Sequence, residues 1–106
     1  MSVAPLKSLD EFRTLVNSGQ VVIIDYWATW CGPCNMISPV FETLASKPEF
    51  SSIKFVKVDV DEQEEISQEV GIRAMPTFQA FKDGLKIDEL VGADPRQLTE
   101  LIQRHV

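Results

Sequence analysis

Residues 21–34, VVIIDYWATWCGPC, decide how this chain folds. The stretch up to Ala28 is apolar on both faces apart from Asp25, and a strand without a polar face belongs in the middle of a sheet that is covered on both sides. The two cysteines, Cys31 and Cys34, follow within a few residues. The cysteine pair is therefore expected just past the end of a central strand.

The segment that contains the second cysteine predicts a helix that begins around residues 32–34. Residues 53–60 are again apolar and β-branched and predict a second buried strand. A strand, a helix and a strand of these lengths form a βαβ unit, whose strands run parallel with a right-handed crossover. The residues of this helix that are expected to face inward recur at helical spacing and are Ile37, Val40, Phe41 and Leu44.

The remaining segments extend this unit on both sides. Residues 8–11, Ser-Leu-Asp-Glu, predict the capping box of a first helix. Other local signals predict a leading strand near residues 3–7, a short acidic helix ended by Gly71, a hairpin of residues 77–81 and 85–91 around Lys82-Asp83-Gly84, and a last helix capped by Asp94. We expect an α/β fold with one central mixed sheet, helices on both faces, and a single domain over residues 1–106.

Composition excludes several classes of function. The 106 residues suit one domain, and ten Lys and Arg against sixteen Asp and Glu give a net charge of −6. Binding to nucleic acid or to an anionic membrane needs a basic face, so neither is expected. No segment approaches the roughly 20 apolar residues of a membrane span, and residues 1–15 lack the apolar core of a signal peptide. We expect a cytoplasmic protein.

The cysteine pair allows three interpretations. As a structural staple it is weak, because closing so short a loop contributes only about 2 kcal/mol in the chain-entropy model. As a zinc site it lacks ligands, because the other candidate, His105, lies next to the C-terminus, where we expect it to be exposed. As a redox pair it is well placed, because the start of a helix favours a thiolate at Cys31, and Cys34, one turn further in, is shielded and able to resolve. We favour the redox interpretation and expect no metal.

Asp25 is the second candidate for a functional side chain. A carboxylate inside an apolar strand is expected to be buried, and burial raises the pKa of an acid. It is either a silent structural acid or a proton carrier beneath the cysteines, and we favour the second. Lys57, which interrupts the neighbouring apolar strand, offers it a supporting partner. The sequence alone assigns no function to Pro76, because proline is tolerated at the start of a strand.

Residues 30–34, WCGPC, stand in a pattern that covers nearly the whole chain. Its other members are Asp25 six residues before Cys31, Pro39 five residues after Cys34, Lys57, Met75-Pro76-Thr77 and Gly92. This pattern resembles the thioredoxin family and is most specific at the cysteines. The resemblance implies a central sheet flanked by four helices, and a cysteine pair that reduces protein disulfides.

The resemblance also implies roles for individual residues. Cys31 would be the nucleophile, Cys34 the resolving thiol, and Asp25 the base that assists Cys34 through water. Pro76 would be a cis-proline that faces the disulfide, and the backbone of Met75 would pair with an extended substrate segment. No cofactor would be bound, and the pair would be re-reduced by a thioredoxin reductase that uses NADPH or by a ferredoxin-dependent enzyme.

A small apolar rim is expected around the cysteines, formed by Trp30, Gly32, Pro33, Ala74, Met75, Gly92 and Ala93. It suits extended protein segments that are read with little side-chain specificity, although ordinary packing is an alternative for Trp30 and Met75. Asn35 stands where the family often has Lys, so the thiolate must depend more on the helix terminus. Gly32-Pro33 argues against glutaredoxins, with their Pro-Tyr pair, and against oxidising enzymes, which favour His there.

Two further expectations concern the rest of the surface. An acidic run is interpreted as a solvated helix face and consists of Asp59, Asp61, Glu62, Glu64, Glu65 and Glu69. The chain is expected to be a monomer. The alternative to a redox enzyme is a binding module whose partners ignore the redox state of the cysteines.

Overall fold

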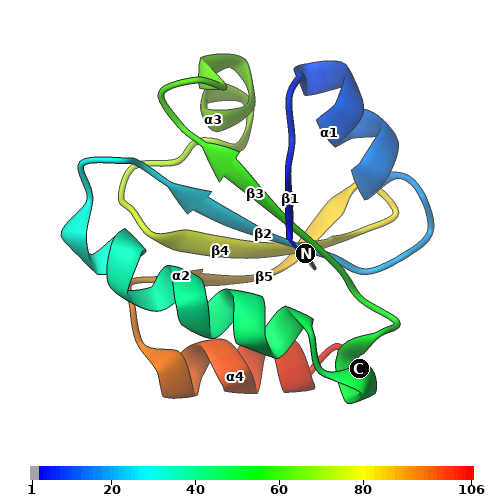
Figure 1. Ribbon diagram of the computed structural model, residues 1–106. Coiled ribbons are helices and arrows are strands. Elements are labelled where there is room, and N and C mark those ends of the chain that lie inside the picture. The colour runs from blue at the N-terminus through cyan, green and yellow to red at the C-terminus, as the bar shows by residue number, and fades with distance from the viewer. Residues whose placement is uncertain (1–2) are drawn as a thin grey trace.

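A mixed sheet of five strands forms the centre of the structure, a computed structural model that describes residues 3–106 (Figure 1). The strands are β1 (Ala4–Pro5), β2 (Val22–Trp27), β3 (Lys54–Asp59), β4 (Thr77–Lys82) and β5 (Leu85–Val91). Their order across the sheet is β1-β3-β2-β4-β5. Strand β3 runs parallel to both β1 and β2, whereas β4 is antiparallel to β2 and β5. The predicted βαβ unit and hairpin are confirmed.

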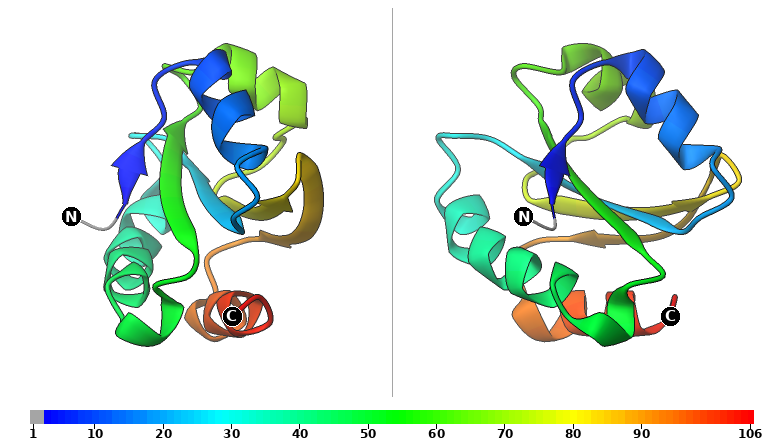
Figure 2. Two further views of the ribbon diagram at one scale, coloured as in Figure 1. Left: turned by 90° about the vertical axis from the view of Figure 1, so that its right-hand side faces the viewer. Right: turned by 45° about the vertical axis from the view of Figure 1, so that its right-hand side comes forward.

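Helices cover both faces of the sheet, as Figures 1 and 2 show. Helices α1 (Leu9–Val16) and α3 (Glu64–Val70) lie together on one face. Helices α2 (Gly32–Ala45) and α4 (Pro95–Gln103) lie together on the other, and a short 3₁₀ turn, Pro48–Phe50, follows α2. No helix in the described part of the chain is long and apolar enough to cross a membrane.

Strand β2 is the central element that sequence patterning predicts. Its first five residues are completely buried or nearly so. Ile24 and Tyr26 contribute to the hydrophobic cluster beneath α1 and α3, whereas Ile23 contributes to the cluster beneath α2 and α4. Because successive side chains of a strand point to opposite faces, Asp25 shares the face of Ile23 and points toward the side of α2.

The ends of the elements carry the local signals expected of them, with one difference. Ser8 Oγ accepts the backbone N–H of Glu11 at 3.1 Å, as a capping box requires. The Glu11 carboxylate accepts the backbone N–H of Lys7 at 3.1 Å and not that of the capping residue. Asp94 caps α4, and the hairpin turn of Asp83 and Gly84 has positive φ at both residues.

The expectation of an exposed His105 is wrong. Its Nε2 lies 2.8 Å from Asp88 Oδ2, and the side chain is only 17% exposed. The same carboxylate oxygen accepts a hydrogen bond from Nε of Arg104 at 3.0 Å. Both partners follow the end of α4 and meet Asp88 on β5, so the chain after α4 is bound back onto the sheet.

Candidate active site

The two cysteines lie where β2 gives way to α2. Cys31 is the N-cap of α2, and its Sγ accepts the backbone N–H of Cys34 at 3.2 Å. A disulfide joins the two residues, whose Cα atoms are 5.3 Å apart. The first turn of a helix presents N–H groups without intrahelical partners and the positive end of the helix dipole. Cys31 therefore occupies the position that best stabilises a thiolate.

The two sulfur-bearing residues differ in their access to solvent. Cys31 is 6% exposed and Cys34 is 1% exposed, so the second cysteine is the more deeply shielded. The intervening residues, Gly32 and Pro33, are exposed. An incoming partner therefore reaches the pair from the side of Cys31.

Trp30 stands exposed beside the pair and is held by a residue that sequence analysis missed. Its side chain is 67% exposed, and its Nε1 donates a hydrogen bond to Asp61 Oδ2 at 2.9 Å. The backbone N–H of Asp61 is in turn bound to Asp59 Oδ1 at 2.9 Å. The sequence placed Asp61 in an acidic run of the surface, and nothing in that run marked one carboxylate as the partner of an indole 31 positions away.

Asp25 is buried beneath this end of the sheet, as predicted. It is paired in register with Lys57 on β3, and burial raises its pKa to about 7 although Lys57 acts in the opposite direction. Its Oδ1 makes no hydrogen bond within the described residues. Lys57 Nζ lies 5.7 Å from the ring centroid of Trp27, a cation–π contact that the sequence did not predict. The structure thus brings together the predicted acid and its predicted partner.

Two loops are joined close to the start of β4. The Met75–Pro76 bond is cis, as the family resemblance implies, and the Pro76 carbonyl accepts the N–H of Gly92 at 2.9 Å. Thr77 Oγ1 donates to the Ala74 carbonyl at 2.6 Å. Gly92 has φ of +112°, a conformation that residues with a side chain rarely adopt. These hydrogen bonds therefore fix the loop that contains Ala74 and Met75 relative to the loop that contains Gly92 and Ala93.

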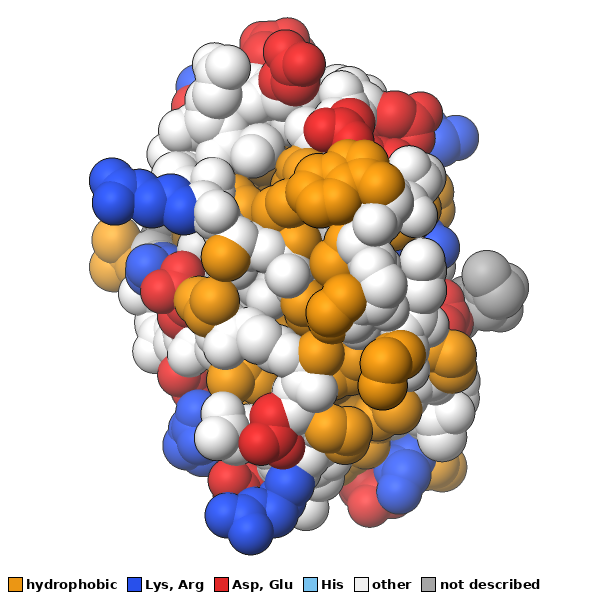
Figure 3. All heavy atoms as spheres, turned by 90° about the vertical axis from the view of Figure 1, so that its left-hand side faces the viewer, with side chains coloured by type: hydrophobic (Ala, Val, Ile, Leu, Met, Phe, Trp, Pro, Cys, Tyr) orange, Lys and Arg blue, Asp and Glu red, His pale blue; other side chains and the backbone are white. Residues whose placement is uncertain are grey.

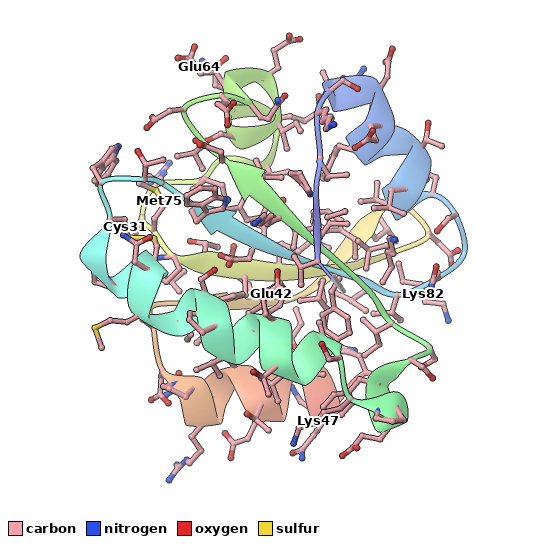
Figure 4. All side chains as sticks on the ribbon, viewed as in Figure 1. Cys31, Glu42, Lys47, Glu64, Met75 and Lys82 are labelled. Atoms are coloured by element: carbon pink, nitrogen blue, oxygen red, sulfur yellow. A yellow bond between two sulfur atoms is a disulfide. The ribbon has the colours of Figure 1, made fainter. Side chains whose placement is uncertain are left out.

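Met75 connects these loops to the cysteines. It is half-buried and packs against the hydrophobic cluster that includes Cys31 and Cys34. Figure 4 shows the labelled Met75 and Cys31 at the same end of the sheet. On the face of the molecule that holds this end, hydrophobic side chains form a broad band, with acidic side chains at its upper end (Figure 3).

The remaining rim residues vary in exposure. Ala74 is exposed, whereas Gly92 and Ala93 are half-buried. Within residues 3–106, no three His, Cys, Asp or Glu side chains form a group that could hold a metal ion. The chemistry that the arrangement supports is that of the cysteine pair itself.

The chain matches the family model described as Thioredoxin over residues 3–104. It belongs to the thioredoxin family. Among curated thioredoxins, that of Coprinus comatus is 58% identical over 102 residues, which cover 96% of each chain. The thioredoxin of Malassezia sympodialis is 55% identical over 103 residues, which cover 97% of this chain and 98% of that one.

Solved thioredoxin structures agree with the fold described above. The crystal structure of Malassezia sympodialis thioredoxin has a TM-score of 0.95 and 56% identity, covering 98% of this chain and 90% of that chain. A chain from a study of how a yeast mitochondrial 1-Cys peroxiredoxin is resolved through glutathione and thioredoxin systems has a TM-score of 0.89 and 40% identity, covering 97% and 95%. Thioredoxins are protein disulfide oxidoreductases, and this chain carries the redox-active cysteine pair of the family. It is a thiol–disulfide oxidoreductase.

Proposed function

We propose that the chain reduces disulfides of other proteins, with Cys31 as nucleophile and Cys34 as resolving thiol. The reduced form attacks a partner disulfide through the Cys31 thiolate, which forms a mixed disulfide and releases one partner sulfur as a thiolate. Cys34, once deprotonated, then attacks the Cys31 sulfur, forms the internal disulfide and releases the second partner thiolate. Two electrons pass to the partner in each cycle. The observation that carries this assignment is the position of Cys31 at the N-cap of α2, with Cys34 shielded behind it.

Asp25 is the proton acceptor for Cys34 in this proposal. A group that takes a proton near neutral pH works best with a pKa near that pH, and burial raises the pKa of Asp25 to about 7. Lys57, paired with it across β2 and β3, lowers the pKa of Asp25 against the effect of burial. The ionised carboxylate, which is the form that accepts a proton, is therefore populated near neutral pH. Both groups lie on the side of the sheet that α2 covers.

Partner segments bind along the apolar rim in an extended conformation. The exposed indole of Trp30 offers contact area, and the backbone beside the cis bond between Met75 and Pro76 offers hydrogen-bonding groups to an extended chain. The proposed rim consists of Trp30, Gly32, Pro33, Ala74, Met75, Gly92 and Ala93. Backbone pairing with little side-chain readout suits an enzyme that acts on many different proteins.

We further propose that the electrons come from NADPH through a thioredoxin reductase, and that the chain acts as an electron carrier in the cytoplasm. We propose that it works as a monomer, because the rim must stay open to partners. A peroxiredoxin, the protein named in one of the related structures, is a suitable client to test.

The test combines a coupled assay with substitutions at the two cysteines and at Asp25. Oxidation of NADPH in the presence of a thioredoxin reductase and insulin should depend on the chain and should stop when both cysteines are replaced by serine. Asp25→Asn should slow resolution of the mixed disulfide near neutral pH, because Cys34 loses its proton acceptor. Asp10→Asn, at an exposed position of α1, is the matched control and should leave resolution unchanged. Equal resolution rates for Asp25→Asn and the unaltered protein at every pH would assign Asp25 a purely structural role.

A further inference from the structure

Helix α2 has an outer surface that carries almost no charge. Its one charged residue is Glu42, which is half-buried. The solvent face of an amphipathic helix normally carries charged side chains, and the other three α-helices of the described chain follow that rule. Their exposed charged residues are Asp10, Glu11 and Arg13 on α1, Glu64, Glu65 and Glu69 on α3, and Arg96 and Glu100 on α4. The outer surface of α2 therefore differs from that of its neighbours.

The residues on this surface form one continuous stripe. Pro33, Met36, Val40 and Thr43 recur at alternating steps of three and four, which places them on one face of the helix. Val40, which was expected to face inward, lies at the edge of this face: it is half-buried and also packs against the hydrophobic cluster beneath α2 and α4. Met36 is 78% exposed, the largest exposure among the large hydrophobic side chains of the described residues. At a rise of 1.5 Å per residue the stripe extends for about 15 Å from the first turn. It begins beside Cys31, the N-cap of the same helix.

The far part of the stripe borders a shallow groove that ends in a positive charge. The groove has a volume of about 290 Å³ and is lined by Pro39, Val40, Thr43, Leu44 and Lys47. Lys47 is exposed and forms no salt bridge with the described residues. Figure 4 shows it past the far end of α2, opposite the end that holds Cys31.

We propose that this stripe is a second docking surface for the protein whose disulfide is attacked. Its occupant is a segment that flanks the attacked cysteine, with apolar side chains against Met36 and Val40 and a carboxylate opposite Lys47. The proposal rests on the proposed function, because the stripe is continuous with the disulfide and a bound partner is already held at Cys31. A complementary carboxylate matches Lys47, which lies at the end of the stripe and forms no salt bridge with the described residues.

A second copy of the chain is a less suitable occupant. A copy seated on the stripe would cover Pro33 as well, and it would block the approach to Cys31. Contact with the stripe would then compete with turnover, whereas a flanking segment of a client reaches the stripe only while the client is being reduced. The stripe thus favours folded protein disulfides over small ones.

The test compares a folded and a small disulfide in single-turnover reduction. Pre-reduced protein is mixed either with an oxidised 2-Cys peroxiredoxin or with 2-hydroxyethyl disulfide, which is small and neutral. Two polar substitutions on the stripe, Met36→Gln with Val40→Thr, should lower the rate constant for the peroxiredoxin about tenfold, a loss of about 1.4 kcal/mol, and leave that for the small disulfide within about twofold. Leu85→Gln with Ile87→Thr, at exposed apolar positions of β5, is the matched control and should change neither rate.

A charge reversal tests the other end of the stripe. Lys47→Glu should slow reduction of the peroxiredoxin and weaken its dependence on salt, whereas Lys82→Glu, an exposed lysine at the end of β4, should not. Equal rates for the stripe variants and the unaltered protein would overturn the proposal. So would a wild-type dimer that the stripe variants dissociate, because the stripe would then be an interface between copies. If the unaltered protein reduces neither disulfide, the proposed function itself fails.

Discussion

Asp25 gives the sharpest test of the electrostatics beneath the disulfide. The perturbation is Asp25→Asn, which keeps the shape of the side chain and removes its ability to ionise. In the unfolded chain the carboxyl has its ordinary pKa of 3.8, whereas burial raises it to about 7 in the folded protein. Between these two values the folded state binds more protons than the unfolded state. The stability of the unaltered protein should therefore fall, relative to that of the variant, as pH rises from about 4 to about 7.

The size of the effect follows from the shift. The two pKa values differ by about three units, and each unit corresponds to about 1.4 kcal/mol, so burial of the ionised Asp25 destabilises the folded protein by about 4 kcal/mol. This destabilisation is fully present above pH 7 and absent below pH 4. The amide of the variant adds a buried N–H₂ group that costs about 1–3 kcal/mol, but this cost is the same at every pH. The quantity to measure is therefore how the difference in the free energy of unfolding between the two proteins changes with pH.

The assay is urea unfolding of the two oxidised proteins across this pH range. The oxidised forms are used because their disulfide-bonded cysteines do not titrate. The free-energy difference should move by about 4 kcal/mol in favour of Asp25→Asn between about pH 4 and about pH 8. A flat difference for Asp25→Asn would show that its carboxylate is solvated and would refute the reasoning.

Two further predictions concern local structure. Asp94→Ala should lower the free energy of unfolding, measured in urea, by about 1 kcal/mol. The reason is that Asp94 Oδ1 accepts the N–H groups of Arg96 and Gln97 at 3.0 and 3.1 Å at the start of α4. Asp94→Asn should lower it much less. Gly84→Ala should cost more than Gly19→Ala in the same assay. Both glycines have positive φ, but only a Cβ at Gly84 would meet another residue, 2.5 Å from Asn17 Oδ1. Moving that amide away disturbs the 2.8 Å hydrogen bond that its Nδ2 donates to the Arg13 carbonyl. Equal losses at the two glycines would contradict this packing.

The fold was largely predictable because its strongest signals are local. A strand that is apolar on both faces apart from Asp25 belongs in the middle of a covered sheet, and the second strand at residues 53–60 then fixes the parallel βαβ unit. The turn at Asp83 and Gly84 supplies the positive φ values that a tight hairpin needs. Each of these features depends on a few neighbouring residues, so the sequence contains it in full.

The parts of the site that sequence analysis missed depend on long-range contacts. The indole of Trp30 meets Asp61 across two loops, and no local pattern marks that carboxylate among its acidic neighbours. Lys57 was predicted to partner Asp25, but its position over the ring of Trp27 follows only from the register of β2 and β3. His105 was misjudged for the same reason, because its partner on β5 is 17 positions away.

The most direct test of the central claim is to identify which cysteine attacks a partner protein. Cys34→Ser and Cys31→Ser are each incubated with an oxidised client, and stable mixed disulfides are mapped by mass spectrometry. Cys34→Ser should accumulate a mixed disulfide at Cys31, because attack is intact and resolution is lost, whereas Cys31→Ser should accumulate almost none. Equal trapping by the two variants, or trapping mainly at Cys34, would contradict the assignment of Cys31 as the nucleophile.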